Sequence, residues 1–131
     1  LALLQNNGNA IFSSPTVVVS GVTYPPGSLI TPPNPTTGNP VSAAYDLDIG
    51  DVDNNGKLDI YINAENIHMV LLNNGNFAFS NLQNVGMLWI GLTPTIPGRI
   101  IKFFDADNDG NLDLLLTRSP PPFTTTLFYH V

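Results

Sequence analysis

The chain has 131 residues and a formal net charge of −6, with 43% hydrophobic and only 11% charged residues. This length and apolar share suit one globular domain with a buried core, and they argue against a disordered chain. The 4 lysines and arginines are scattered and make no phosphate-binding stripe, so we expect no nucleic-acid partner. No apolar run reaches the roughly 20 residues of a membrane helix, and the absence of cysteine excludes disulfides and thiol chemistry.

The first predicted element is a hairpin near the N-terminus. Asn7 and Gly8 lie between the apolar runs of LLQNNGNAIFSS, residues 3–14. Asn-Gly is the favoured pair for a tight turn because both residues tolerate positive φ. The same arrangement recurs at Asn74 and Gly75 in LLNNGNFAFSN, residues 71–81. We therefore expect two related hairpins, each with Asn-Gly at its turn.

Two proline-rich segments, residues 24–40 and 119–123, interrupt the apolar pattern. Proline has no amide donor and disrupts a central strand, so we expect exposed loops with polyproline II character. Their composition favours rigid connectors, but a recognition loop or a glycosylated Pro/Ser/Thr tract remains open. N-glycosylation is not predicted, because no Asn-x-Ser/Thr sequence has an acceptable middle residue.

Four further segments have the length and composition of strands. They are rich in aliphatic and aromatic residues and show no sustained 3.6-residue period. The segments are KLDIYIN (57–63), GMLWIGL (86–92), RIIKFF (99–104) and NLDLLLT (111–117). The sequence therefore predicts a single all-β domain over residues 1–131, with several strands buried on both faces.

Most of the acidic residues gather in two nine-residue loops, 51–59 and 105–113. These loops hold seven of the ten acids: Asp51, Asp53, Asp59, Asp105, Asp107, Asp109 and Asp113. The loops repeat at an offset of 54 (113 − 59), whereas the Asn-Gly pairs repeat at 67 (74 − 7). The unequal offsets indicate one repeat with connecting loops of different length. The acidity is therefore local and indicates a site.

The residue order in both loops is that of a calcium site. Oxygen side chains stand at positions 1, 3, 5 and 9, glycine at position 6, and a backbone carbonyl at position 7. The proposed ligands are Asp51, Asp53, Asn55, the Lys57 carbonyl and Asp59 in the first loop, and Asp105, Asp107, Asp109, the Asn111 carbonyl and Asp113 in the second. A solvated turn without metal is the alternative, but two loops with the same spacing favour Ca²⁺.

The two loops differ in charge. The second has four carboxylates against three in the first, so we expect it to bind calcium more tightly. Two bound Ca²⁺ would change the formal charge from −6 to −2. Asp46 and Asp48 lie just upstream; they are extra ligands or polar strand positions, and the second interpretation is slightly favoured.

The sequence around the loops resembles the FG-GAP/VCBS repeat. An EF-hand needs an acid at position 12 and a following helix, whereas position 12 here is Ile62 or Leu116 in a strand-like run. Residues 45–79 instead follow the FG-GAP/VCBS order of strand, acidic loop, strand and Asn-Gly hairpin, and residues 100–117 follow its first half. The resemblance implies blades of a β-propeller clipped by two Ca²⁺, a secreted or cell-surface location, and an adhesive or sugar-binding role.

No catalytic constellation is evident in the sequence. His68 and His130 lie in strand-like runs, Glu65 has no obvious acidic partner, and Trp89 lies among aliphatic residues typical of a core. The proposed calcium loops supply their own ligands, whereas a catalytic metal keeps an open position. We therefore expect a non-catalytic protein.

The number of repeats is too small for a closed propeller. About two repeats fit in the chain, whereas a propeller has roughly four to eight blades. The chain does not begin with Met, so we expect a mature or excised segment. It is then part of a longer propeller, a protomer that closes a ring with copies of itself, or a subunit joined to neighbours through terminal strands. The functional expectation is a calcium-stabilised extracellular module that binds glycan or protein, or alternatively a self-assembling filament subunit.

Overall fold

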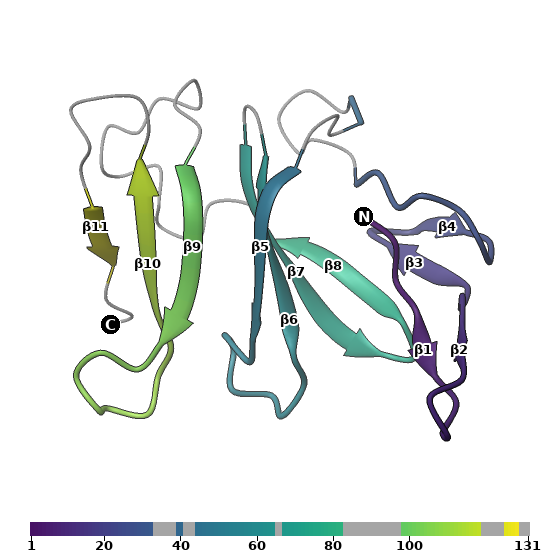
Figure 1. Ribbon diagram of the computed structural model, residues 1–131, viewed down its shortest axis with the longest axis horizontal. Helices are drawn as coiled ribbons and strands as arrows, with labels where there is room; N and C mark the ends of the chain where they lie inside the picture. Colours follow the sequence, from purple (N-terminus) through teal and green to yellow (C-terminus); the bar gives the residue numbers. More distant parts are fainter. Residues whose placement is uncertain (33–38, 41–43, 65–66, 83–97, 119–124, 129–131) are drawn as a thin grey trace.

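The computed structural model describes residues 1–32, 39–40, 44–64, 67–82, 98–118 and 125–128. Within these ranges the chain contains strands and no helix, which confirms the all-β prediction (Figure 1). The strands are β1 (Gln5–Asn6), β2 (Phe12–Ser13), β3 (Val17–Val19), β4 (Val22–Tyr24), β5 (Ala44–Gly50), β6 (Asp59–Ala64), β7 (Ile67–Gly75), β8 (Ala78–Leu82), β9 (Gly98–Phe104), β10 (Asp113–Arg118) and β11 (Thr125–Phe128).

The strands form three sheets. The largest has the order β4-β3-β8-β7-β6-β5, the second has the order β11-β10-β9, and β1 and β2 form a separate hairpin. Neighbouring strands are antiparallel except β3 and β8, which are parallel. The meanders β5–β8 and β9–β11 correspond to the two repeats predicted from the acidic loops, and β5 and β9 lie side by side where the two sheets meet (Figure 1).

Two apolar clusters cover the two faces of the six-stranded sheet. One joins Ile62, Met69 and Leu71 to the N-terminal strands, and the other joins Tyr61 and Val70 to the three-stranded sheet. Strand β6 is buried on both faces, as its sequence predicted, because neighbouring side chains alternate between the two clusters. Burial also raises the pKa of the Tyr61 phenol far above its ordinary value, so this hydroxyl stays neutral.

The predicted strands of residues 57–63, 99–104 and 111–117 correspond to β6, β9 and β10. The predicted strand 86–92, with Trp89, lies outside the described residues, as do residues 119–123, Glu65 and His130. The expectation that the proline-rich segment 24–40 is wholly exposed is wrong in its described part. Ile30 is buried in the core, and its backbone amide donates to the Leu1 carbonyl at 2.8 Å. Burial of the apolar Ile30 side chain is more favourable than its exposure to water, so this part of the segment packs against the core.

The hairpins occur where expected, but their turns do not centre on Asn-Gly. The turn residues are Asn76 and Phe77 in the β7–β8 hairpin, both with positive φ (53° and 58°). Gly75, with a φ of 90°, instead lies at a register shift in β7. Glycine is therefore used at the bulge, where a side chain would be strained, and the turn begins one residue later. Asn9 and Ala10 form the equivalent turn in the first hairpin.

Two aspartates of β5 join the two larger sheets. The Asp46 carboxylate accepts a hydrogen bond from the Ile101 amide at 2.9 Å, and the Asp48 carboxylate accepts one from the Phe103 amide at 2.6 Å. The Lys102 ammonium also donates to Asp48 at 3.2 Å. These side chains therefore satisfy backbone donors on the edge of β9 that no described strand pairs with.

Candidate metal centre

The first acidic loop connects β5 to β6 and turns its carboxylates toward one another. Oxygens of Asp51, Asp53 and Asp59 all lie within 4.8 Å of one another. The bend depends on positive φ at Asn54 (56°) and Gly56 (80°), the second of which favours glycine. Like charges this close repel one another unless a cation or hydrogen bonds compensate them.

Backbone amides of the first loop point into the same cluster. The Asp51 carboxylate accepts from the amides of Asn55 at 2.9 Å and Gly56 at 2.8 Å. Asp59 is fully buried, and its two oxygens accept from the amides of Val52 at 2.9 Å and Asn73 at 2.7 Å. Asp59 thereby connects the loop to the β7–β8 hairpin. Its place at the start of β6 and these two hydrogen bonds hold its carboxylate without a bound metal.

The second loop, between β9 and β10, repeats this network. The Asp105 carboxylate accepts from the amides of Asp109 at 3.1 Å and Gly110 at 3.0 Å, and Asp113 accepts from Ala106 at 2.8 Å. Positive φ recurs at Asn108 and Gly110. Every one of these bonds has a first-loop counterpart 54 residues earlier (105 − 51), so the nine residues encode the same local structure twice.

The two loops bring together slightly different carboxylates. The second cluster comprises Asp105, Asp107 and Asp109, whose oxygens also lie within 4.8 Å of one another, whereas Asp113 is not part of it. The side-chain oxygens of Asn55 and Asp109, at position 5, accept from the following Lys57 and Asn111 amides at 2.9 and 2.8 Å. The position-5 side chain thus supports the residue whose carbonyl was predicted as a ligand.

The donor set fits a hard divalent cation. Carboxylate, amide and carbonyl oxygens are the ligands that calcium prefers. Within the described part of the chain, no lysine or arginine forms an ion pair with Asp51, Asp53 or Asp59. The negative charge of the first cluster is therefore balanced only by hydrogen bonds, and a bound cation would compensate it directly.

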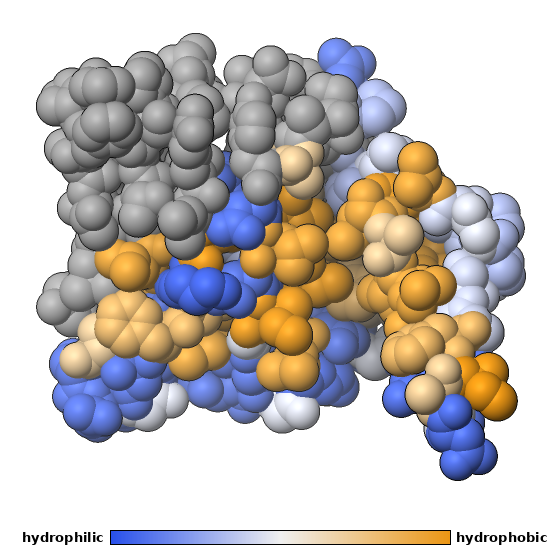
Figure 2. Space-filling view, in the orientation of Figure 1, coloured by the Kyte–Doolittle hydropathy of each residue, from blue (hydrophilic) through white to orange (hydrophobic). Residues whose placement is uncertain are grey.

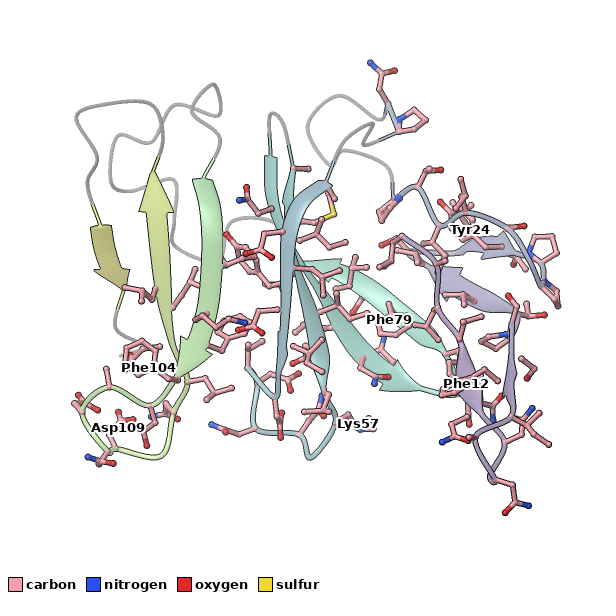
Figure 3. All side chains as sticks on the ribbon, viewed as in Figure 1. Phe12, Tyr24, Lys57, Phe79, Phe104 and Asp109 are labelled. Atoms are coloured by element: carbon pink, nitrogen blue, oxygen red, sulfur yellow. The ribbon has the colours of Figure 1, made fainter. Side chains whose placement is uncertain are left out.

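The two loops lie next to each other at one end of the molecule. The Asn54 amide group donates to the Asn111 side-chain oxygen at 2.9 Å. Figure 3 shows both loops at the lower edge, near the labelled Lys57 and Asp109. Gly50, just before the first loop, faces the second repeat so closely that an added Cβ would lie 2.6 Å from the Leu112 Cδ1 atom.

Comparison with known protein families gives a match over this part of the chain. The family model of the FG-GAP-like repeat matches residues 51–116, just over half of the chain, from the first acidic loop into β10. The chain belongs to the FG-GAP-like repeat family. No curated protein and no solved structure matches the chain significantly.

FG-GAP-like repeats are generally non-catalytic structural modules and are typical of extracellular proteins. In this FG-GAP-like chain the described residues include no helix that is long and apolar enough to cross a membrane. The matched segment contains both acidic loops, so the family assignment and the two loops refer to the same part of the molecule.

Sequence reasoning missed the functions of three polar residues. Asp46 and Asp48 lie in a strand, which is the interpretation that the sequence slightly favoured. Their carboxylates also accept hydrogen bonds from backbone amides of β9, which was not predicted. Asn73 donates its amide to Asp59 and its side-chain NH₂ to the Leu58 carbonyl at 3.0 Å. The alternation of Asp46 and Asp48 along β5 placed both on one face, but only the structure shows what that face meets.

Proposed function

We propose that the protein is a calcium-stabilised, non-catalytic structural and adhesive module of an extracellular or cell-surface protein. The observation that carries the proposal is the duplicated loop, in which three carboxylates converge twice with the same supporting hydrogen bonds. The two sheets would act as blades of a propeller-type assembly. Calcium would supply a fixed positive charge to each loop and tie the ends of its flanking strands together.

The proposed ligands keep the sequence-predicted set, with distinct tasks. The carboxylates at positions 1 and 3 would come from Asp51 and Asp53 in the first loop and from Asp105 and Asp107 in the second. The side-chain oxygen at position 5 would come from Asn55 in the first loop and from Asp109 in the second. The carbonyls of Lys57 and Asn111 and the carboxylates of Asp59 and Asp113 would complete the sites. Because Asp59 also binds the Asn73 amide, filling the first site would stabilise the β7–β8 hairpin as well.

The adhesive part of the proposal concerns a glycan or an extracellular protein as ligand. It is supported by the family resemblance and by the exposed segment before Ile30, where Leu29 projects into solvent. A second candidate function, a self-assembling subunit, is favoured by large apolar side chains exposed on β1–β2 and β5. Filaments seen by negative-stain microscopy in millimolar calcium that dissolve in chelator would support this second function.

The calcium proposal is tested by thermal unfolding in calcium and in chelator. At a calcium concentration a hundred times Kd, each site should add about 2.7 kcal/mol to the free energy of unfolding. The double variant Asp107→Ala/Asp113→Ala should lose the second-loop share of this stabilisation, and Asp51→Ala/Asp53→Ala the first-loop share. Isothermal titration calorimetry should give two sites in the wild type.

A matched control separates calcium binding from general loss of stability. Asp48→Ala removes a carboxylate outside both loops, so its melting temperature should fall while the calcium-dependent rise persists. If the loop variants show the same calcium-dependent rise as the wild type, the assignment of the loops as calcium sites is wrong.

A further inference from the structure

Strand β5 has two faces, and the second repeat covers one of them. Asp46 and Asp48 face β9, whereas Leu47 and Ile49 alternate with them and point the other way. Leu47 is 44% and Ile49 54% exposed, and Leu58, at the end of the adjoining loop, is 58% exposed. Figure 2 shows this apolar surface above the hydrophilic edge of the loops.

The second repeat shows how the same three positions are used when they are covered. At an offset of 54, Leu47, Ile49 and Leu58 correspond to Ile101, Phe103 and Leu112. Ile101 is fully buried and Phe103 packs with it against the first repeat, with its ring 5.8 Å from that of Tyr61 in an edge-to-face arrangement. Leu112 approaches Gly50 of the first repeat. The three exposed residues are thus counterparts of three residues that hold the two repeats together.

The second repeat presents the equivalent of the surface with which the first repeat contacts it. The first repeat contacts the second through Asp48, Gly50 and Tyr61. At the same offset of 54, their counterparts in the second repeat are Lys102, Phe104 and Leu115. These three share one face, since Lys102 pairs with Leu115 across the strands and Phe104 lies two residues from Lys102. Phe104 is 40% exposed.

The side-chain sizes at the two surfaces differ from those at the contact within the chain. Inside the chain, the large Phe103 packs against Gly50, where a Cβ would come within 3.3 Å of its ring. Between the exposed surfaces, Phe104 stands at the position of Gly50 and would meet Ile49 and Leu58, the counterparts of Phe103 and Leu112. Because an added Cβ at Gly50 would already overlap Leu112, the Phe104 ring requires a wider spacing between the docked copies than between the two repeats within the chain.

We infer that a second copy of this chain docks head to tail, with Phe104 and Leu115 of one copy against Leu47, Ile49 and Leu58 of the next. The contact continues the interface that already joins β5 to β9. It is heterologous, because different surfaces meet, so it builds rings or open filaments. The inference rests on the self-assembly function proposed above and names the contact for it.

This contact should be weaker than the one within the chain. Lys102 occupies the position of Asp48, so the docked copy offers no carboxylate there for the strand amides of its neighbour. The Leu47 amide is already bound by its own Asp46 side chain at 3.0 Å. We therefore expect association that depends on protein concentration, as for an interface held mainly by apolar contact.

The test measures solution mass by light scattering or sedimentation over a concentration series in millimolar calcium. The wild type should show masses that rise above the 14.1 kDa of one chain. Ile49→Asp should abolish assembly from one side and Phe104→Asp from the other, so each variant alone should stay monomeric. Mixed together they should form a species of two chains, because each retains the surface that the other has lost. Leu29→Asp, at an exposed site outside both surfaces, should assemble like the wild type.

Circular dichroism of each variant checks that it is folded. Because Phe104→Asp should be a folded monomer, its calcium-dependent melting rise tests the calcium proposal separately from assembly. A monomeric wild type at every concentration would overturn the inference. So would assembly of Ile49→Asp or Phe104→Asp alone, or failure of the two variants to pair when mixed.

Discussion

The hairpins β1–β2 and β7–β8 have the same local structure but very different surroundings. In both, an asparagine side chain accepts the amide of the glycine two residues later, Asn6 from Gly8 at 2.9 Å and Asn73 from Gly75 at 2.8 Å. Both turns have two residues with positive φ. Yet Phe79 is 6% exposed, whereas its counterpart Phe12, 67 residues earlier (79 − 12), is 59% exposed (Figure 3).

This difference shows that the turn is encoded locally, while burial depends on neighbouring strands. The β7–β8 hairpin lies beside β6, and Asn73 reaches the first acidic loop through Asp59. In the described part of the chain, β1 and β2 pair only with each other. Within the described residues, the first hairpin therefore has the apolar side chains of a packed repeat but no further strand paired beside it.

The largest expected effect comes from truncating the two equivalent phenylalanines. Phe79→Ala should lower the free energy of unfolding by about 3–5 kcal/mol, because it leaves a cavity in the core. Phe12→Ala should change it by less than about 0.5 kcal/mol, because an exposed ring has little burial to lose. Denaturant unfolding at low protein concentration measures both values. Similar losses for the two variants would mean that the first hairpin is packed in solution.

A second prediction concerns the contact between β5 and β9. Asp48→Ala should cost about 1.5–3 kcal/mol of unfolding free energy, because it removes the charged acceptor of the Phe103 amide. Lys102→Ala, which removes only the exposed partner of the Asp48–Lys102 ion pair, should cost at most about 1 kcal/mol. Thermal or denaturant unfolding distinguishes the two. An equal loss in both variants would show that the ion pair, and not the amide bond, is the main contribution of Asp48.

Local patterns in the sequence predict the loops and the strands, but not the contacts between residues that are distant in the chain. The acidic loops and the strands around them were predictable because the ligand order of each loop and the aliphatic and aromatic composition of each strand lie within nine or fewer consecutive residues. The role of Asp48 was not predictable, because its carboxylate accepts a hydrogen bond from an amide that lies 55 residues away in the sequence. The turn position was also missed, because glycine is favoured equally by a tight turn and by the bulge that it occupies at Gly75.

The smallest predicted effect compares the two acidic loops. They differ at position 5, where the first has Asn55 and the second has Asp109, and both side chains support the next ligand in the same way. Asp109→Asn therefore changes the charge with little change in shape. Because calcium affinity follows the number of charged ligands, Kd of the second site should rise roughly tenfold, which is about 1.4 kcal/mol.

The reverse variant, Asn55→Asp, should tighten the first site by a similar factor, as measured by calcium titration against a competing chelator. The two variants together exchange the charges of the loops and should exchange the order of their affinities. Unchanged affinities would mean that position 5 acts only through its hydrogen bond to the following amide, which asparagine and aspartate accept equally. In that case the first loop would be expected to bind calcium as tightly as the second, despite its smaller charge.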